Sequence, residues 1–321
     1  MRGVFLGTAA GRPTVSRNVP ALLLQREGES FLFDCGEGTQ RQMMRYGTGF
    51  SVDDIFLTHL HADHFLGVTG LLRTMGLQGR QTPVRLWTPA GTERMLHRAV
   101  TLGYERLPFP VEIHGLEPEQ RVERTAYTVI AFAVDHHPRV RCLGYAFVEP
   151  PRRGRFFPER ARALGVPEGP LWGRLAAGEA VEVDGRRIEP RDVLGPPRPG
   201  RCVVYSGDTR PCETTRRYAA GADLLIHEAT FAQDEAERAR LTGHATAAGA
   251  ARLAAAARVR RLVLTHISPR YADDPRALER EAQLHFPSVQ VAHDGLVVEV
   301  PYVDAVPEWQ DSGGTVGATA P

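Results

Sequence analysis

The run HLHADH, from His59 to His64, constrains this chain more than any other feature of its sequence. Imidazoles and carboxylates are the usual ligands of zinc, and a two-metal hydrolytic site holds its ions about 3.5–4 Å apart with a water between them. The apolar stretch Asp54–Thr58 predicts a strand, so His59 and His61, two residues apart, should face the same way. The turn that follows then offers Asp63 and His64 to a second ion. The run therefore predicts a metal site that activates water.

Three further stretches supply the partner ligands that such a site needs. Each places ligand-type side chains after an apolar stretch that predicts a strand: His136 and His137 after Thr128–Val134, Asp208 after Cys202–Tyr205, and His266 after Arg261–Thr265. Side chains at the ends of several strands meet at one edge of a layered sheet, and such rigid elements hold metal ligands well. The sequence therefore predicts that these residues share one site with the run HLHADH.

The bulk composition is that of an ordinary globular enzyme. Of the 321 residues, 42% are apolar and 24% are charged. No apolar run approaches the roughly 20 residues that span a bilayer. The start MRGVFLGTAAG lacks the layout of a secretory signal, so we expect a cytoplasmic protein without a membrane partner. No C-x-x-C pair occurs, and we interpret the four cysteines as reduced, mostly buried thiols; they are Cys35, Cys142, Cys202 and Cys212.

Short apolar runs alternate along the chain with a few helical stretches. The expected strands are Val4–Leu6, Ala21–Gln25, Phe31–Phe33, Asp54–Thr58, Arg85–Trp87, Thr128–Val134, Tyr145–Val148, Cys202–Tyr205, Leu224–Ile226, Arg261–Thr265 and Leu296–Val300. The expected helices are Gly38–Tyr46, Leu66–Met75, Gly91–Leu102, Thr246–Ala257 and Pro275–His285. Hairpins and helices mixed in this order favour sheets covered by helices over an all-β sandwich.

Two segments differ in composition from the rest. Residues 152–195 form an insert rich in Arg, Pro and Gly, and Arg152–Arg201 holds 11 arginines against 7 acids, a local excess of +4. The whole chain has a net charge of only +1, so binding to a polyanion must depend on a locally basic segment such as this one. Residues 303–321 offer little that can pack, and we expect this tail to be disordered.

Several motifs resemble one family over nearly the whole chain, from about Met1 to Tyr302. The pattern H-x-H-x-D-H, followed by single His, Asp and His residues after later strands, resembles the metallo-β-lactamase superfamily. Within it, the chain resembles the ribonuclease Z family of tRNA 3′-processing endonucleases through FLGTAAGRPTVSRN, LFDCGEGTQRQ, THLHADHFLG, GDTRPCE, HEATF, GHAT and THISPRY. The resemblance implies an α/β (α+β) fold, a four-layer αββα sandwich over residues 1–302, with the insert 152–195 as a protruding tRNA-binding arm.

The same resemblance implies two zinc ions per subunit. One ion would be held by His59, His61, His136 and Asp208, and the other by Asp63, His64, Asp208 and His266, so that Asp208 bridges them. The segment between the third histidine and the following LGY is one residue longer here than is usual in the family, which leaves His137 open as an alternative. We choose His136 because it continues the strand pattern AFAVDH.

Three residues are expected to act on the substrate. The resemblance implies that Asp63 orients or deprotonates the attacking water and that His244 of GHAT protonates the leaving 3′ oxygen as a general acid. Glu228 of HEATF would orient His244. The expected products of precursor tRNA cleavage are a tRNA with a 3′-hydroxyl and a trailer with a 5′-phosphate.

Other polar residues receive supporting roles. Arg17 and Asn18 match the family's PTxxRN stretch, and we expect them to meet phosphate or to buttress the site. Asp34 is expected to support a metal-binding histidine through a hydrogen bond. The remaining histidines outside the motifs are interpreted as structural or exposed; they are His97, His114, His285 and His293.

The stretch LGVPEGPLW in the insert resembles the Gly-Pro motif of the arm with which ribonuclease Z clasps folded tRNA. Recognition of a folded RNA by its shape and phosphates requires arginines spread over a surface. A homodimer is expected by resemblance only. Two rival functions are an enzyme of this fold that acts on a small phosphodiester and a binding protein on a disabled hydrolase fold. The Gly-Pro motif argues against the first, and the filled ligand positions argue against the second.

Overall fold

In this computed structural model, residues 1–103 and 106–303 are described, and they belong to two compact units. The first unit holds Met1–Pro150 and Arg201–Pro301, and the second holds Pro151–Gly200 together with Tyr302 and Val303. The tail predicted for residues 303–321 lies outside the described residues, apart from Val303.

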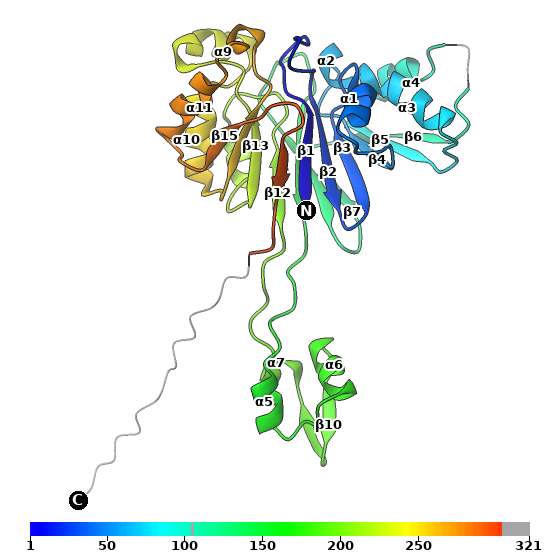
Figure 1. The fold of residues 1–321 in the computed structure, drawn as a ribbon, viewed down its shortest axis with the longest axis vertical. Coiled ribbons are helices and arrows are strands. Elements are labelled where there is room, and N and C mark those ends of the chain that lie inside the picture. Colours follow the sequence, from blue (N-terminus) through cyan, green and yellow to red (C-terminus); the bar gives the residue numbers. More distant parts are fainter. Residues whose placement is uncertain (104–105, 304–321) are drawn as a thin grey trace, which may run out of the picture. The chain divides into compact units, whose positions relative to one another are not determined.

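The first unit is built on two seven-stranded sheets (Figure 1). The first sheet has the order β16 (Val297–Glu299), β1 (Arg2–Gly7), β2 (Ala21–Arg26), β3 (Glu29–Phe33), β4 (Asp54–Phe56), β5 (Val84–Pro89) and β6 (Val111–Leu116). The second has the order β15 (Val289–Val291), β14 (Leu262–Thr265), β13 (Leu224–Glu228), β12 (Cys202–Tyr205), β9 (Leu143–Val148), β8 (Thr128–Ala133) and β7 (Arg121–Glu123). In each sheet, four consecutive strands are parallel, β3 to β6 and β12 to β15.

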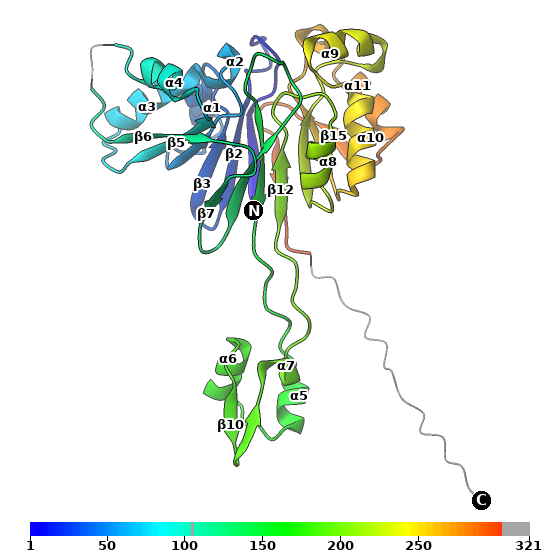
Figure 2. The same ribbon diagram turned by 180° about the vertical axis from the view of Figure 1, so that it is seen from behind.

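Helices cover the outer face of each sheet (Figures 1 and 2). Those beside the first sheet are α1 (Thr39–Arg45), α2 (Ala62–Phe65), α3 (Gly67–Leu77) and α4 (Glu93–Val100). Those beside the second are α8 (Glu213–Tyr218), α9 (Ala236–Thr242), α10 (Ala247–Ala257) and α11 (Arg276–Gln283). One apolar core fills the space between the two sheets. A second core lies between the first sheet and its helices, and a third lies between the second sheet and its helices. The predicted four-layer αββα sandwich is confirmed.

Most predicted strands and helices are present within one to three residues of their predicted ends, with two instructive differences. β4 ends at Phe56 and not at Thr58, because the Thr58 N–H donates to Asp34 Oδ1 (2.8 Å) and no longer to a neighbouring strand. β6 was not predicted, because Glu112, His114 and Gly115 interrupt its apolar pattern.

The second unit has a small core of its own. It contains α5 (Pro158–Ala163), α6 (Pro170–Ala176), α7 (Pro190–Val193) and the hairpin β10 (Val181–Val183) and β11 (Arg186–Ile188). Each of the three helices begins with proline, whose fixed φ suits the first helical position and whose missing N–H is not needed there. The buried residues that pack together are Ala161, Val166, Leu175, Val181, Ile188 and Val193. The insert is therefore a folded element and not an open loop.

The four cysteines are free; Cys35 is buried, and the other three are partly buried. None of the helices in the described part of the chain combines the length and the apolar character needed to cross a bilayer.

A buried charge cluster joins the two places where the chain leaves and re-enters the first unit. Glu149 accepts hydrogen bonds from Arg26 Nε at 2.5 Å and from Arg201 Nη2 at 2.7 Å, and all three side chains are at most 8% exposed. Burial opposes ionisation of Glu149, but the hydrogen bonds from Arg201 and Arg26 outweigh it and lower its pKa to about 2.

Replacing Glu149 by Ala should destabilise the first unit by about 3 kcal/mol or more, because two buried guanidinium groups lose their shared counter-charge. Urea unfolding followed by circular dichroism measures this change. The exposed Glu237→Ala variant is the control and should unfold like the parent chain. Equal stability of the two variants would contradict the importance of the cluster.

Candidate metal centre

The predicted site residues come from both sheets and stand at or just beyond the carboxyl ends of their strands. His59 and His61 follow β4, and Asp63 and His64 lie in α2. From the second sheet, His136 follows β8, Asp208 follows β12, His266 follows β14, and Glu228 is the last residue of β13. His244 lies between α9 and α10. The structure brings all of these residues together.

One group consists of His59, His61, His136 and Asp208, whose ligand atoms all lie within 4.8 Å of one another. His59 Nε2 and His61 Nδ1 are 2.8 Å apart, and His136 Nε2 lies 3.4 Å from the same His61 nitrogen. His59, His136 and Asp208 are buried, whereas His61 is partly exposed. Three imidazole nitrogens and one carboxylate thus surround a single point, which is a suitable donor set for a zinc ion.

The second group consists of Asp63, His64 and His266. We call these two sets of residues the metal-type groups. Asp63 Oδ2 lies 3.5 Å from both His64 Nε2 and His266 Nε2. Asp208 Oδ2 reaches the same two nitrogens at 3.4 and 3.3 Å, and it lies 3.8 Å from His59 Nε2 of the first group. Asp208 therefore faces both groups at once.

The ring orientation of four histidines is set by hydrogen bonds at Nδ1, and this leaves Nε2 for a metal. His64 Nδ1 donates to Asp34 Oδ2 at 2.8 Å, and His136 Nδ1 donates to the Gly243 carbonyl at 2.8 Å. The remaining two pairs are His59 Nδ1 with Thr58 Oγ1 at 3.0 Å and His266 Nδ1 with Thr230 Oγ1 at 2.8 Å. The hydrogen bond expected from Asp34 to a histidine of the site is present.

Buried polar atoms without a hydrogen-bond partner support the fit of a cation. Among the described residues, these atoms include His64 Nε2, His266 Nε2 and Asp208 Oδ1. Burial disfavours the charged form of Asp208, but the imidazoles of His266 and His64 outweigh burial and hold its pKa well below the usual range. This mixed set of imidazole nitrogens and an anionic carboxylate suits a zinc-type ion, whereas magnesium prefers a shell made of oxygen ligands alone.

The two adjacent histidines lie in different surroundings. His136 is 4% exposed and belongs to the first group. His137 is exposed, and its Nδ1 accepts a hydrogen bond from the Arg139 N–H at 3.2 Å. The structure therefore brings His136, and not His137, to the other ligands.

His244 and Glu228 form a pair beside the second group. His244 Nδ1 donates to Glu228 Oε1 at 2.8 Å, so Nε2 remains for another partner. Glu228 is 1% exposed and also accepts hydrogen bonds from the backbone N–H groups of Thr209 and Ala245, at 2.7 and 3.0 Å. Burial lowers the pKa of His244, but the charge and the hydrogen bond of Glu228 outweigh burial and raise it to about 9. The pair can therefore supply a proton near neutral pH.

The structure adds residues that the sequence did not reveal. Thr230, two residues after Glu228, donates to Glu228 Oε2 at 2.7 Å while it accepts from His266. Gly11 donates its N–H to Asp63 Oδ2 at 2.8 Å. Thr230 lies inside HEATF and could have been singled out from that motif, whereas nothing in the sequence pattern points to Gly11.

The residues given supporting or structural roles are also placed. Arg17 is 7% exposed, and it hydrogen-bonds to Thr8 Oγ1 and to the Ala292 carbonyl, so it buttresses the site region and does not face solvent. Asn18 Nδ2 donates to the Glu37 carbonyl at 2.9 Å. The four histidines outside the motifs do not belong to the metal-type groups: His97, His285 and His293 are exposed, and His114 stacks on the ring of Trp87.

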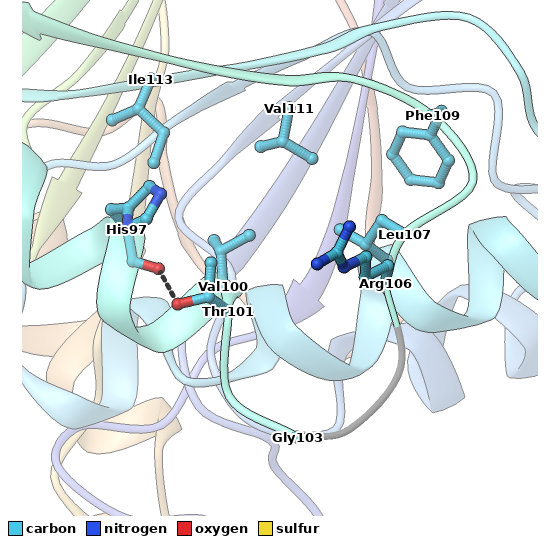
Figure 3. Close-up of a pocket in the computed structure, with 9 residues that line it drawn as sticks. All are labelled: His97, Val100, Thr101, Gly103, Arg106, Leu107, Phe109, Val111 and Ile113. Atoms are coloured by element: carbon cyan, nitrogen blue, oxygen red, sulfur yellow. Dashed lines mark hydrogen bonds between the residues drawn. The ribbon is translucent and has the colours of Figure 1, made fainter.

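A separate pocket of about 420 Å³ lies between α4 and β6 (Figure 3). Its walls include the apolar side chains of Val100, Leu107 and Phe109, and Thr101 Oγ1 donates to the His97 carbonyl at 2.8 Å. No residue of the two metal-type groups lines it, so this pocket is not part of the metal centre.

Comparisons with known proteins agree with this fold. Residues 16–129 match the model of the metallo-beta-lactamase superfamily, and residues 180–267 match that of a beta-lactamase superfamily domain. The chain is 57% identical to ribonuclease Z of Gemmatimonas aurantiaca over 298 residues, which cover 92% of this chain and 95% of that protein. It is 53% identical to ribonuclease Z of Myxococcus xanthus over 306 residues, which cover 95% and 99%. The crystal structure of human tRNase Z, short form, matches with a TM-score of 0.68 at 29% identity and covers 94% of this chain and 100% of that chain.

The αββα sandwich, with histidines and aspartates gathered at the strand ends, defines a metallo-β-lactamase-type hydrolase. At this identity and coverage, the chain belongs to the ribonuclease Z family. It is accordingly a metal-dependent endoribonuclease.

Replacing His136 by Ala should reduce the bound divalent metal by about half or more, because the first group loses one of its three imidazoles. His137→Ala is the matched control and should keep the metal content of the parent chain, because that side chain is exposed. Metal analysis of the purified proteins decides, and the reverse order of loss would refute the assignment of His136.

Proposed function

We propose that this chain removes the 3′ trailer from precursor tRNA as a zinc-dependent endoribonuclease with two metal ions per subunit. The observation that carries the proposal is the Glu228–His244 pair beside two adjoining metal-type groups that share Asp208. Membership of the ribonuclease Z family supports the substrate class.

The proposed ligands divide as the geometry suggests. His59, His61, His136 and Asp208 would hold one ion, and Asp63, His64, His266 and Asp208 would hold the other. When bound, the ions would lower the pKa of a water molecule and offset the charge that develops on the phosphate oxygens.

Asp63 has the position of the residue that orients the attacking water. Its Oδ2 accepts the Gly11 N–H at 2.8 Å, so the carboxylate is fixed at the opening of the second group. In the proposed step, Asp63 accepts a hydrogen bond or the proton from water as the new P–O bond forms.

His244 would act on the leaving 3′ oxygen of the tRNA, whereas Asp63 acts on the attacking water. Its Nδ1 is held by Glu228, and its Nε2 can carry the proton that the 3′ oxygen takes when the P–O3′ bond breaks. The products would be a tRNA with a 3′-hydroxyl and a trailer with a 5′-phosphate. Glu228 thus acts through His244, by orienting the ring and stabilising its protonated form.

The insert is proposed to bind the tRNA body. It is a folded unit with its own core, and many of its arginines are exposed, among them Arg153, Arg155, Arg186 and Arg187. Guanidinium groups spread over such a surface suit the phosphates of a folded RNA. We also propose a homodimer that works in the cytoplasm, where the substrate would be met.

Cleavage of one precursor tRNA with a defined trailer tests the function. We expect a single cut after the tRNA body, a 3′-hydroxyl on the tRNA, and loss of activity on treatment with a chelator that returns when zinc is added. An enzyme for small phosphodiesters would hydrolyse a nitrophenyl diester efficiently and leave the tRNA intact. A binding protein would leave both substrates intact.

The His244→Ala variant should keep its zinc but lose about 10²–10⁴-fold in kcat, because the leaving oxygen loses its proton donor. Single-turnover cleavage of precursor tRNA, together with metal analysis, measures both effects. The exposed His285→Ala variant is the control. Parent-like kcat in the His244 variant would rule out its role as the general acid.

Replacing residues 153–195 by a short Gly/Ser linker should raise KM for precursor tRNA by about tenfold or more, because the insert's arginines no longer meet RNA phosphates. Hydrolysis of a nitrophenyl phosphodiester should be unchanged, because the metal ligands all lie in the first unit. An equal fall in both activities would show that the insert maintains the catalytic unit and does not bind RNA.

A further inference from the structure

The loop between β1 and β2 reaches both sides of the second metal-type group. Gly11 donates its N–H to Asp63 Oδ2 at 2.8 Å. On the other side, the Ile267 N–H donates to the Thr8 carbonyl at 2.8 Å, and the Ala10 N–H donates to the Ile267 carbonyl at 3.0 Å. Ile267 directly follows His266, so this loop holds the backbone beside one proposed ligand and the carboxylate of another.

The outer part of this loop, residues 11–16, has little apolar packing, whereas Ala9 and Ala10 at its start are buried. A cavity of about 860 Å³ is lined by loop residues together with residues of α1 and Asp294. At the tip, Val15 is fully exposed, and Arg12 and Pro13 are exposed as well. The position of the loop must therefore depend on a small number of polar contacts at its base.

Asp294, in the turn before β16, makes three of these contacts. Its Oδ1 accepts from Thr8 Oγ1 at 2.8 Å, at the start of the loop. Its Oδ2 accepts from the Asn18 N–H at 2.6 Å, at the end of the loop, and from Gln42 Nε2 of α1 at 2.6 Å. One carboxylate thus joins both ends of the loop to a helix of the first layer.

Arg17 is a buried member of the same hydrogen-bond network. Its Nη1 donates to Thr8 Oγ1 at 2.7 Å and to the Ala292 carbonyl at 2.6 Å, two residues before Asp294. The backbone of the loop base is paired as well, since Thr8 and Ala9 both donate to the Asn18 carbonyl at 2.8 Å. Without the carboxylate of Asp294, the Thr8 hydroxyl and the Asn18 N–H would lose their acceptor, and Gln42 Nε2 would keep only the Leu6 carbonyl.

We propose that Asp294 is a positioning residue that anchors the loop 8–18 and thereby holds Asp63 and His266 in place for the second metal ion. The proposal rests on the zinc centre of the proposed function, but it concerns a carboxylate that belongs to neither metal-type group. The expected effect differs between the two ions. Among the described residues, the hydrogen bonds of the loop reach Asp63 and the backbone beside His266, and none joins the loop to His59 or His136 of the first group.

The test compares the zinc content of three purified full-length variants without RNA. Asp294→Ala should retain about one ion and lose the other, with a decrease in affinity of about 10–100-fold at the second position. Asp294→Asn should keep both ions, because its amide oxygen can accept from Asn18 and Gln42 while its amide N–H donates to Thr8. Asp273→Ala, an exposed aspartate, is the matched control.

Hydrogen exchange gives a second readout that does not depend on catalysis. Amides of residues 8–18 should exchange faster in Asp294→Ala than in Asp294→Asn, and an excess of zinc should restore the second ion. Retention of both ions with unchanged exchange in Asp294→Ala would overturn the proposal. Loss of both ions together would also overturn it, because a general structural defect is not selective.

Thr8→Val is the second variant if Asp294→Ala does not fold. Thr8 is fully buried, and valine has nearly the same shape but lacks the hydroxyl that links Arg17 to Asp294. We expect a smaller loss of the second ion in the same direction, and parent-like zinc content would count against the proposal. These readouts need no RNA, so a failure of tRNA cleavage by the parent chain would refute the proposed function and leave this test intact.

Discussion

The carboxylate of Asp208 is the group around which the rest of the site is arranged. It is 3% exposed, and its Oδ2 faces Nε2 atoms of His59, His64 and His266 at 3.3–3.8 Å. A buried anion is unfavourable unless positive charge and hydrogen bonds compensate it. The imidazoles of His59, His64 and His266 use Nδ1 for neighbouring protein groups, so in their neutral form they turn the Nε2 lone pair toward the centre. Metal cations are the partners that satisfy the carboxylate and the lone pairs together.

That arrangement requires both sheets. The first sheet contributes the segment from His59 to His64, and the second contributes His136, Asp208 and His266. The core between the sheets is rich in aromatic rings, such as Phe33, which stacks on Phe56 and lies near Tyr145. This packing fixes the distance between the two sets of strand ends to the precision that a metal site needs. Tyr205 also crosses from the second sheet to donate to Asp34 Oδ2 at 2.9 Å.

Much of the fold and the site's residue types could be predicted because each ligand follows an apolar strand or lies in the dense run HLHADH. The strand predicted to lead into His59 and His61 was too long at its end. β4 ends at Phe56, and beyond it the Thr58 N–H donates to the side chain of Asp34. Edge strands such as β6 and the short helix α2 carry too few apolar residues for a pattern. Contacts such as that between Asp294 and Asn18 join residues 276 positions apart, and no local pattern encodes them.

Two of the predicted residues, Asp34 and His266, have a backbone conformation that the sequence pattern does not indicate. Asp34 and His266 both follow a strand directly and have φ near +56°, in the left-handed region where a side chain costs about 1 kcal/mol or more. Glycine would remove that cost, but it would also remove the side chain that each turn delivers to the site. The surroundings hold each turn instead: Asp34 donates its N–H to the Phe56 carbonyl, and the residue after His266 pairs with Thr8. The β1–β2 loop, with its base fixed by Asp294, is therefore part of what keeps the strained His266 turn in the conformation that directs its imidazole toward Asp208.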